Sequence, residues 1–373
     1  MERREKMQHN LDLHGGNIYK AAKQYGIHPD QILDFSANIN PLGVPESVKR
    51  TIVSNLDNLA NYPDPECSEL KTGISEYLKI PEEYIIVGNG ASEIISLVFS
   101  VLDFKNVLIP GPTFAEYPKA ADSCGVRVVS FEMKETEGFN LNVDQLIQSM
   151  TKDIDAIFLC NPNNPTSNLI SREKLKVIIE AAKERNVFVV LDEAFIELTA
   201  EGNTNSMIDL VPSYPNLFVI RAFTKVFAIP GLRLGYGVGN TEVIRRLWIR
   251  KMPWSVSLLA CSLGSLFQKE RAYLNRTTEW IREEKKWLYE ELSGIKELRP
   301  FEPHANFILI KILSMDMTAG ALKDKMAQKG ILIRDASNFI FLNRQYFRVA
   351  IKDRASNKKL VNTLRAVLEG MHG

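Results

Sequence analysis

The strongest constraint on the fold is a regular alternation of short apolar runs and longer amphipathic segments over residues 80–240. Several of the short runs are apolar throughout, as strands are when helices cover both faces of their sheet. Six runs predict strands: YIIVG (84–88), NVLIP (106–110), VRVVSFEM (126–133), AIFLCNP (156–162), VFVVLDEA (187–194) and LFVIRAF (217–223).

The segments between these runs have the spacing of amphipathic helices. Helices are predicted at ASEIISLVFSVL (91–102), FAEYPKAADSCG (114–125) and SREKLKVIIEAAKERN (171–186). In the third segment, Ser171 supplies a helix start signal ahead of Lys174. Strands that alternate with helices in this way predict an α/β fold, with a mostly parallel sheet between two layers of helices.

The pattern changes beyond about residue 255. A long charged segment at residues 271–294 predicts a helix, and three strand-like runs follow it: ANFILIKI, ILIRDAS and YFRVAIK. This α+β pattern is consistent with a second, smaller domain. We therefore expect a large domain over residues 46–270 and a small domain formed by residues 1–45 and 271–373, with the N-terminal segment irregular.

The charge balance excludes several classes of partner. Lys and Arg number 46 against 45 Asp and Glu, which leaves a net charge of +1 and no bulk field for nucleic acid or an anionic membrane. No stretch approaches 18 apolar residues, and the charged N-terminus lacks the apolar core of a signal peptide. A cytoplasmic protein is therefore expected.

The cysteines and histidines show no pattern of a disulfide framework or a metal site. Four cysteines stand far apart and form no CxxC, which favours free thiols in a reducing compartment: Cys67, Cys124, Cys160 and Cys261. The five histidines lack metal-ligand spacing, so a zinc site is not expected.

Polar residues follow three of the predicted strands, and ligands of parallel sheets bind at this edge. GNGASE (88–93) opens a helix, so the amides of Ala91 and Ser92 suit a phosphate, although a plain glycine turn explains the motif equally well. NPNNPT (161–166) presents the amide of Asn164 or is merely a turn. DEAF (192–195) closes an apolar strand with Asp192, a carboxylate that needs a cation or a hydrogen-bond network.

A fourth strand end supplies two cations, Lys225 and Arg233, inside the otherwise apolar stretch FTKVFAIPGLRLGY (223–236). A single buried lysine usually extends its amine to solvent, so Lys225 alone would not indicate a functional site. Together, however, the strand ends offer a phosphate cradle, an amide, a carboxylate and an amine. This combination suits pyridoxal 5′-phosphate, whose aldehyde reacts with an amine and whose protonated ring accepts electrons.

These motifs resemble those of the fold-type I pyridoxal 5′-phosphate enzymes of the aspartate aminotransferase superfamily, and the resemblance covers nearly the whole chain. GNGASE, PTFAEY, NPNNPT, DEAF and TKVFAIPGLRLGY carry it in that order. Within the superfamily the chain resembles the histidinol-phosphate aminotransferases and, more closely, the L-threonine-O-3-phosphate decarboxylases of cobalamin biosynthesis. HGGNIYKAA (14–22), LDFSANINPLG (33–43), DEAFIEL (192–198) and MPWSVS (252–257) favour the decarboxylases.

The resemblance implies a seven-stranded, mostly parallel sheet between helices and a role for each cofactor-binding residue. Lys225 would bond covalently to the cofactor, and Asp192 would pair with its pyridine nitrogen. Asn164 would contact the ring's hydroxyl oxygen, and Phe114 would stack on the ring. The cofactor phosphate would be held by a set of donors: Ala91, Ser92, Thr224, Arg233 and, from the other subunit of a homodimer, Tyr62.

The resemblance also implies how a phosphorylated amino acid is bound. Arg348 of YFRVAIK would bind the substrate carboxylate, and Arg334 of ILIRDAS, with His14 and Asn38, would bind the substrate phosphate. Taken alone, both arginines would be surface cations near strand ends. The implied reaction is decarboxylation of L-threonine O-3-phosphate, with serine phosphate left open because one methyl group gives little discrimination.

Two other functions remain open at this point. The first is histidinol-phosphate aminotransfer, which needs the same cofactor residues and the same two anion sites. The second is a non-catalytic effector-binding domain, which needs neither the amine of Lys225 nor the carboxylate of Asp192. Three positions depart from the usual pattern. Phe195 stands where many aminotransferases have a tyrosine, Ala222 replaces a phosphate-binding serine, and Ser167 replaces a glycine after NPNNPT.

Overall fold

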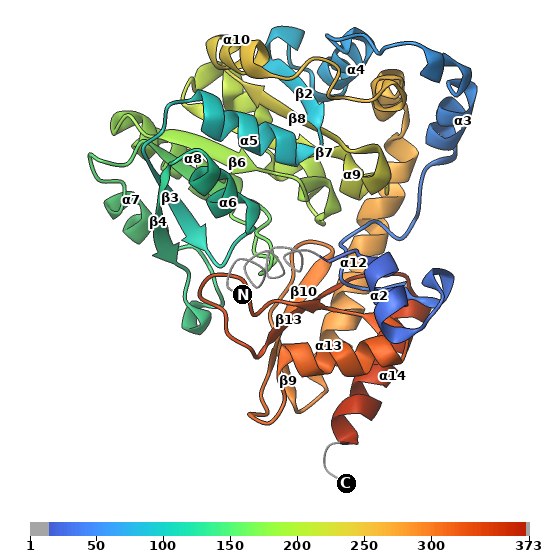
Figure 1. The fold of residues 1–373 in the computed structure, drawn as a ribbon. Helices are drawn as coiled ribbons and strands as arrows, with labels where there is room; N and C mark the ends of the chain where they lie inside the picture. Colours follow the sequence, from blue (N-terminus) through green and yellow to red (C-terminus); the bar gives the residue numbers. More distant parts are fainter. Residues whose placement is uncertain (1–14, 371–373) are drawn as a thin grey trace, which may run out of the picture.

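The computed structural model describes residues 15–370, which form a large and a small sheet, with a third pairing of two short strands (Figure 1). The large sheet has, in spatial order, strands β2 (Ile85–Asn89), β8 (Leu234–Gly239), β7 (Leu217–Ala222), β6 (Phe188–Asp192), β5 (Ala156–Cys160), β3 (Asn106–Gly111) and β4 (Arg127–Glu132). Four of its strand pairings are parallel, and β8 is antiparallel to both neighbours. The predicted α/β fold with a mostly parallel sheet is confirmed.

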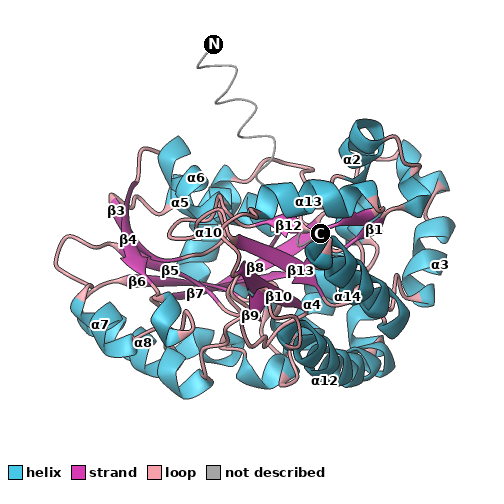
Figure 2. Cartoon of the chain, turned by 90° about the horizontal axis from the view of Figure 1, so that it is seen from below, coloured by secondary structure: helices cyan, strands magenta, loops and turns pink. Residues whose placement is uncertain are grey.

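Helices cover both faces of this sheet, as Figures 1 and 2 show. The helices of this part of the chain are α3 (Glu46–Ser54), α4 (Ser68–Leu78), α5 (Ala91–Val101), α6 (Glu116–Ser123), α7 (Val143–Gln148), α8 (Arg172–Glu184), α9 (Phe223–Val226), α10 (Thr241–Arg250) and α11 (Leu258–Cys261), of which α3 lies away from the sheet (Figure 1). Leu191 and Val219 pack in the apolar layer that contains α4 and α8, whereas Val190 and Ile220 pack with α5, α6 and α10. Successive strand residues thus enter opposite cores, which is why the strands are apolar throughout.

The predicted elements of this region end within two residues of the observed ones. The start signal of α8 is confirmed, because Ser171 Oγ accepts a hydrogen bond from the Lys174 amide at 3.4 Å. β8 was not predicted. Its sequence, LGYGVG, contains three glycines, and glycine is depleted in strands.

The C-terminal part contains a four-stranded antiparallel sheet in the order β12-β13-β10-β9, packed against helices. Its elements are α12 (Arg271–Ser293), β9 (Leu298–Pro300), β10 (Phe307–Ile312), α13 (Ala319–Gln328), β11 (Ile331–Leu332), β12 (Arg334–Asp335), β13 (Tyr346–Ala350) and α14 (Arg354–Glu369). Between residues 15 and 370, no helix combines the length and apolar character needed to cross a bilayer.

The N-terminal segment joins this part through β1 (Leu33–Asp34), which pairs in parallel with β11. The expectation of an irregular segment is wrong for α2 (Ile18–Tyr25). Asn17 Oδ1 accepts a hydrogen bond from the Lys20 amide at 2.9 Å, and Gly26 ends the helix with a positive φ of 66°. A side-chain cap and a left-handed glycine are together a complete pair of helix signals. The exact limits of the two domains stay a prediction.

Helix α4 touches the short 3-10 helix Gly264–Lys269 at a contact between two glycines. A Cβ atom on Gly73 would lie 1.8 Å from the carbonyl oxygen of Gly264, and a Cβ on Gly264 would lie 2.2 Å from the carbonyl oxygen of Glu69. Both neighbours are backbone atoms, so neither can rotate out of the way. Glycine at both positions therefore sets how closely the two helices approach.

We predict that Gly73→Ala and Gly264→Ala each lower the free energy of unfolding by about 1–3 kcal/mol, because the added methyl group forces the two backbones apart. Denaturant titration of each variant measures the change. Gly231→Ala is the matched control, since a Cβ there meets no atom within 4 Å, and it should change stability by less than about 0.5 kcal/mol. Equal stability of all three variants would contradict the assignment.

Candidate active site

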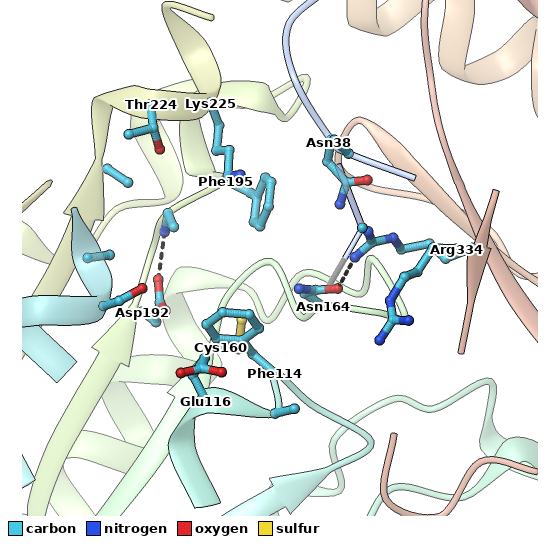
Figure 3. A pocket seen from close by; sticks show the side chains of 18 of the residues that line it. Asn38, Phe114, Glu116, Cys160, Asn164, Asp192, Phe195, Thr224, Lys225 and Arg334 are labelled. Carbon is cyan, nitrogen blue, oxygen red and sulfur yellow. Dashed lines mark hydrogen bonds between the residues drawn. The ribbon is translucent and has the colours of Figure 1, made fainter. Parts of the chain in front are cut away.

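A cavity of about 410 Å³ lies at the carboxyl ends of β5, β6 and β7 and extends to the small sheet (Figure 3). Most of the residues predicted from the strand ends and from the resemblance line it: Asn38, Ala91, Ser92, Phe114, Asn164, Asp192, Thr224, Lys225, Arg233, Arg334 and Arg348. In Figure 3, Thr224, Lys225 and Asp192 lie on one side, and Asn38 and Arg334 lie on the other. The structure therefore joins residues of both sheets in a single site.

The turn from β2 into α5 forms one corner of this cavity. Gly90 has a positive φ of 77°, and a Cβ atom there would lie 2.5 Å from a guanidinium nitrogen of Arg233. A Cβ on Gly235 would lie 2.3 Å from the amide nitrogen of Ala91. The two glycines thus let Arg233 and the first turn of α5 approach each other. A guanidinium beside a helix N-terminus is a strong combination for binding a phosphate group.

Asp192, the last residue of β6, is a buried carboxylate at the wall of the cavity. Its Oδ2 accepts a hydrogen bond from the Tyr117 hydroxyl at 2.7 Å, and its Oδ1 accepts one from the Ala194 amide at 2.9 Å. Burial raises the pKa of Asp192, and these two hydrogen bonds oppose the rise. No ion pair involves Asp192 within residues 15–370. The carboxylate therefore suits a cationic group that enters the cavity.

Tyr117 is a site residue that the sequence analysis missed. It ends the quoted motif PTFAEY and lies in α6, three positions after Phe114. The two rings are 5.5 Å apart at an angle of 81°. Phe114 precedes α6 in the structure, but in the helix predicted at residues 114–125 the two aromatic residues are three apart and share a face, so their spacing was an available signal.

Lys225 lies in the short helix α9, directly after β7, and its side chain points into the cavity (Figure 3). Burial, together with the charges of the nearby Arg348 and Arg233, lowers the pKa of Lys225 to about 8. An amine with such a pKa is partly neutral at physiological pH, and only the neutral amine is a nucleophile.

Arg348 and Asn164 contact each other across the middle of the site. Arg348 donates one hydrogen bond to Asn164 Oδ1 and another, of 2.7 Å, to the carbonyl oxygen of Ser36. Its guanidinium also lies 5.4 Å from the ring centre of Phe307. Burial, with the charge of Arg334, lowers the pKa of Arg348 to about 9. A buried cation of this kind is poised for an anionic ligand.

Arg334 and Asn38 form the far end of the cavity. Arg334 donates a hydrogen bond of 2.8 Å to Asn338 Oδ1, and its guanidinium lies 5.4 Å from the ring centre of Phe339. Asn38 is only 3% exposed, and its Oδ1 has no hydrogen-bond partner among residues 15–370. Asn338 and Phe339 belong to SNFIFLNRQYF, and nothing in their sequence pattern indicated that they would orient Arg334.

Two predicted site residues are not placed in the cavity. Tyr62 is 80% exposed and lies outside the cavity, where its ring is tilted by 37° against that of Trp254 with ring centres 4.9 Å apart. His14 lies outside the described residues. Neither predicted role is tested within the single chain.

The three departures from the usual pattern all lie at or beside the site. Phe195 and Ala222 line the cavity. Because Ala222 stands where a serine is usual, the cavity wall lacks one side-chain hydroxyl. Ser167 has a positive φ of 66°, which explains why glycine is usual there. Its Oγ accepts hydrogen bonds from the amides of His304 and Ala305 at 3.2 and 2.8 Å. These bonds to the chain ahead of β10 offset the cost of the strained backbone.

Comparison with known proteins agrees with this site. The family model for aminotransferase class I and II matches residues 30–364. Threonine-phosphate decarboxylase of Salmonella typhimurium is 38% identical over 359 residues, covering 96% of this chain and 97% of that protein. Histidinol-phosphate aminotransferase of Methanopyrus kandleri is 30% identical over 370 residues, covering 95% and 93%.

Among solved structures, histidinol-phosphate aminotransferase from Clostridium acetobutylicum aligns with a TM-score of 0.85 and 37% identity, over 91% of this chain and all of that one. The likeness in fold thus covers most of this chain. The chain belongs to the aminotransferase class I and II family.

Proposed function

We propose that this chain binds pyridoxal 5′-phosphate, which members of its family use. Two observations support the fit. Asp192 is a buried carboxylate that has no ion pair within residues 15–370, and it suits a protonated ring nitrogen. The corner formed by Gly90, Ala91 and Arg233 suits the phosphate. When bound, the cofactor supplies an electron sink for a bond at the substrate's Cα.

The remaining residues of this end have supporting roles in the proposal. Lys225 would hold the cofactor covalently and would move a proton at the substrate's Cα. Ser92 and Thr224 add donors for the phosphate, Phe114 covers the ring, and Asn164 contacts the ring's hydroxyl oxygen. Lys225 is suited to both of its tasks because its pKa of about 8 allows the amine to give and to take a proton near neutral pH.

We further propose that the reaction is decarboxylation of L-threonine O-3-phosphate to (R)-1-aminopropan-2-yl phosphate. The observation that carries this proposal is that Asn38 and Arg334 face Lys225 across one cavity, which Arg348 also lines (Figure 3). Arg334 and Asn38 bind the substrate phosphate, with His14 as a further predicted ligand, while Arg348 binds the carboxylate. The similarity to the Salmonella decarboxylase supports this choice.

The proposed mechanism depends on orientation. By holding the phosphate at one end, Arg334 and Asn38 set the rotation about the bonds of Cα, so that the bond to the carboxylate is the one aligned for cleavage. The carboxylate leaves as CO₂, and its bonding electrons remain at Cα until Lys225 delivers a proton there. Asp192 would stabilise the positive charge on the ring nitrogen of the cofactor, and this charge makes the ring an effective electron sink.

The second candidate is histidinol-phosphate aminotransfer. It is favoured by the Clostridium structure of that name, which is 37% identical to this chain. In that reaction the Cα–H bond would be the aligned one. A purely effector-binding role is less well supported, because the lowered pKa of Lys225 serves chemistry rather than binding.

We also propose the two-domain division and the cytoplasmic location that the sequence predicts.

We predict that the purified protein, supplied with pyridoxal 5′-phosphate, releases CO₂ from O-phospho-L-threonine. Lys225→Ala should lose at least about 10³-fold in rate, because the variant lacks the amine proposed to bond to the cofactor and to carry the proton at Cα. Release of labelled CO₂ measures the reaction. Absence of CO₂, together with 2-oxoglutarate-dependent turnover of histidinol phosphate, would replace the decarboxylase with the aminotransferase.

The role of the phosphate is tested with the same assay. L-Threonine lacks the phosphate and should be a poor substrate. Arg334→Met should lower kcat/KM for the phosphorylated substrate by about 10–100-fold, the value of a charge-assisted hydrogen bond. Lys323→Met removes a nearby positive charge outside the cavity and is the matched control. Equal losses in both variants would exclude a specific contact by Arg334.

We predict that Lys225 reacts with acetic anhydride with a midpoint near pH 8, as expected from its lowered pKa. At pH 7 about one tenth of such amines are neutral, against well under a thousandth for a lysine with the usual pKa of about 10.4. Mass spectrometry of the Lys225 peptide across pH measures this. Arg348→Met removes a repelling charge and should move the midpoint upward. A midpoint above pH 10 in the unchanged protein would contradict the assignment.

We predict that the chain forms a homodimer in which Tyr62 reaches the cofactor phosphate of the other subunit. Its 80% exposure in the single chain supports a role outside that chain. Sedimentation should give twice the 42.2 kDa chain mass, and Tyr62→Phe should weaken cofactor binding by about 10-fold. Tyr19→Phe, at another exposed tyrosine, is the control. A monomer, or an unchanged Kd for the cofactor, would refute the prediction.

A further inference from the structure

Two cysteines that are distant in the sequence lie together in the structure. Cys67 immediately precedes α4 and is 3% exposed, and Cys261 is the last residue of α11 and is partly exposed. The Cys261 thiol donates a hydrogen bond to Cys67 Sγ, with the two sulfur atoms 2.9 Å apart. A disulfide bond is about 2.05 Å long, so only a small movement separates the two thiols from a covalent link.

The packing of the surrounding helices holds this pair in place. The glycine contact between Gly73 and Gly264 brings α4 against the segment that follows α11. At the start of α4, Asp64 accepts hydrogen bonds from the amides of Cys67 and Ser68 at 3.0 and 2.8 Å. Cys67 itself has a positive φ of 50°. A backbone fixed on both sides leaves the two sulfur atoms facing each other.

The pair is also suited to react. A cavity of about 240 Å³ is lined by both cysteines, so a small oxidant has access to them. The thiol hydrogen bond from Cys261, supported by the charge of Lys251, lowers the pKa of Cys67, and a position at a helix N-terminus acts in the same direction. In contrast, Cys160 lies at the wall of the active-site cavity, and burial raises its pKa to about 12. Cys124 is exposed, and its sulfur atom contacts the Ser123 hydroxyl rather than a second cysteine.

We propose that Cys67 and Cys261 form a reversible oxidation site that a hydroperoxide converts to a disulfide. The Cys67 thiolate attacks one peroxide oxygen, the O–O bond breaks, and the other oxygen leaves as water after taking a proton. The Cys261 thiol then attacks the resulting sulfenic acid, the S–O bond breaks, and the hydroxyl group leaves as water with the thiol proton. Two thiols and one hydrogen peroxide thus give one disulfide and two water molecules.

The disulfide would fix the segment that carries Tyr62. This segment lies directly before Cys67 and lines the same cavity, and the link would tie it to α11 across 194 positions of the chain. A cross-link that closes so long a loop restricts the unfolded chain strongly. Oxidation therefore makes this edge of the large sheet's domain more rigid, whatever reaction the enzyme catalyses.

The test treats the reduced full-length protein with a small molar excess of hydrogen peroxide and then blocks the remaining thiols with N-ethylmaleimide. The number of free thiols, measured after denaturation, should fall from the four in the sequence to two per chain. Peptide mapping without reduction should show the Cys67 and Cys261 peptides joined and two hydrogen atoms lighter. The thermal midpoint should rise by about 2–5 °C, and dithiothreitol should reverse all three changes.

Three variants complete the design. Cys124→Ser should still form the link, with a fall from three thiols to one. Cys261→Ala changes the more exposed partner and should abolish both the link and the rise in thermal midpoint, and Cys67→Ser should do the same. A joined peptide that contains Cys124 or Cys160, a link between two chains, or Cys67 oxidised to a sulfinic acid while Cys261 stays free would each overturn the proposal.

Discussion

The register of three neighbouring parallel strands is the constraint on which the site depends. Cys160 at the end of β5 lies opposite Asp192 at the end of β6, and Asp192 lies opposite Ile220 of β7. Because strand side chains alternate between faces, this register directs Asp192 into the cavity and Glu193 away from it. A slip of one residue would exchange the two carboxylates and send Arg221 toward the position of Ala222. The chemistry of the site is thus set by strand pairing.

A buried ion-pair network on the opposite side of the sheet opposes such a slip. Arg221 is 1% exposed and donates hydrogen bonds to Glu193, at 3.0 Å, and to Glu197. Removing one partner of a buried pair costs about 3–5 kcal/mol, since a charge is left uncompensated. A shifted register would leave three such charges without their partners. We infer that the network specifies the register more than it adds stability.

Strand runs and strand ends are local features, and they predicted most strands of the large sheet and six residues of the cavity: Ala91, Ser92, Asn164, Asp192, Lys225 and Arg233. Five further cavity residues came only from the resemblance to a known family: Asn38, Phe114, Thr224, Arg334 and Arg348. The sequence did not predict contacts that depend on packing between distant elements. Tyr117 meets Asp192 across 75 positions, and Cys67 meets Cys261 across 194. β8 was missed for a physical reason: a Cβ on Gly237 would lie 2.3 Å from the Phe218 ring. Its glycines make room for a neighbour that no local pattern reveals.

Because Arg348 already donates a hydrogen bond to Asn164, a ligand that binds Arg348 has to replace this contact. In the single chain, two donors of Arg348 are already engaged, with Asn164 Oδ1 and the Ser36 carbonyl oxygen, while its Nε has no partner in the part of the chain that the structure describes. A neutral group that displaced Asn164 would replace one hydrogen bond with another of similar strength. A carboxylate would replace it with a stronger, charge-assisted pair. The guanidinium thus favours a negatively charged ligand over a neutral one. When such a ligand binds Arg348, Asn164 would lose its hydrogen bond to Arg348, so binding at one end of the cavity would change a contact toward the other end.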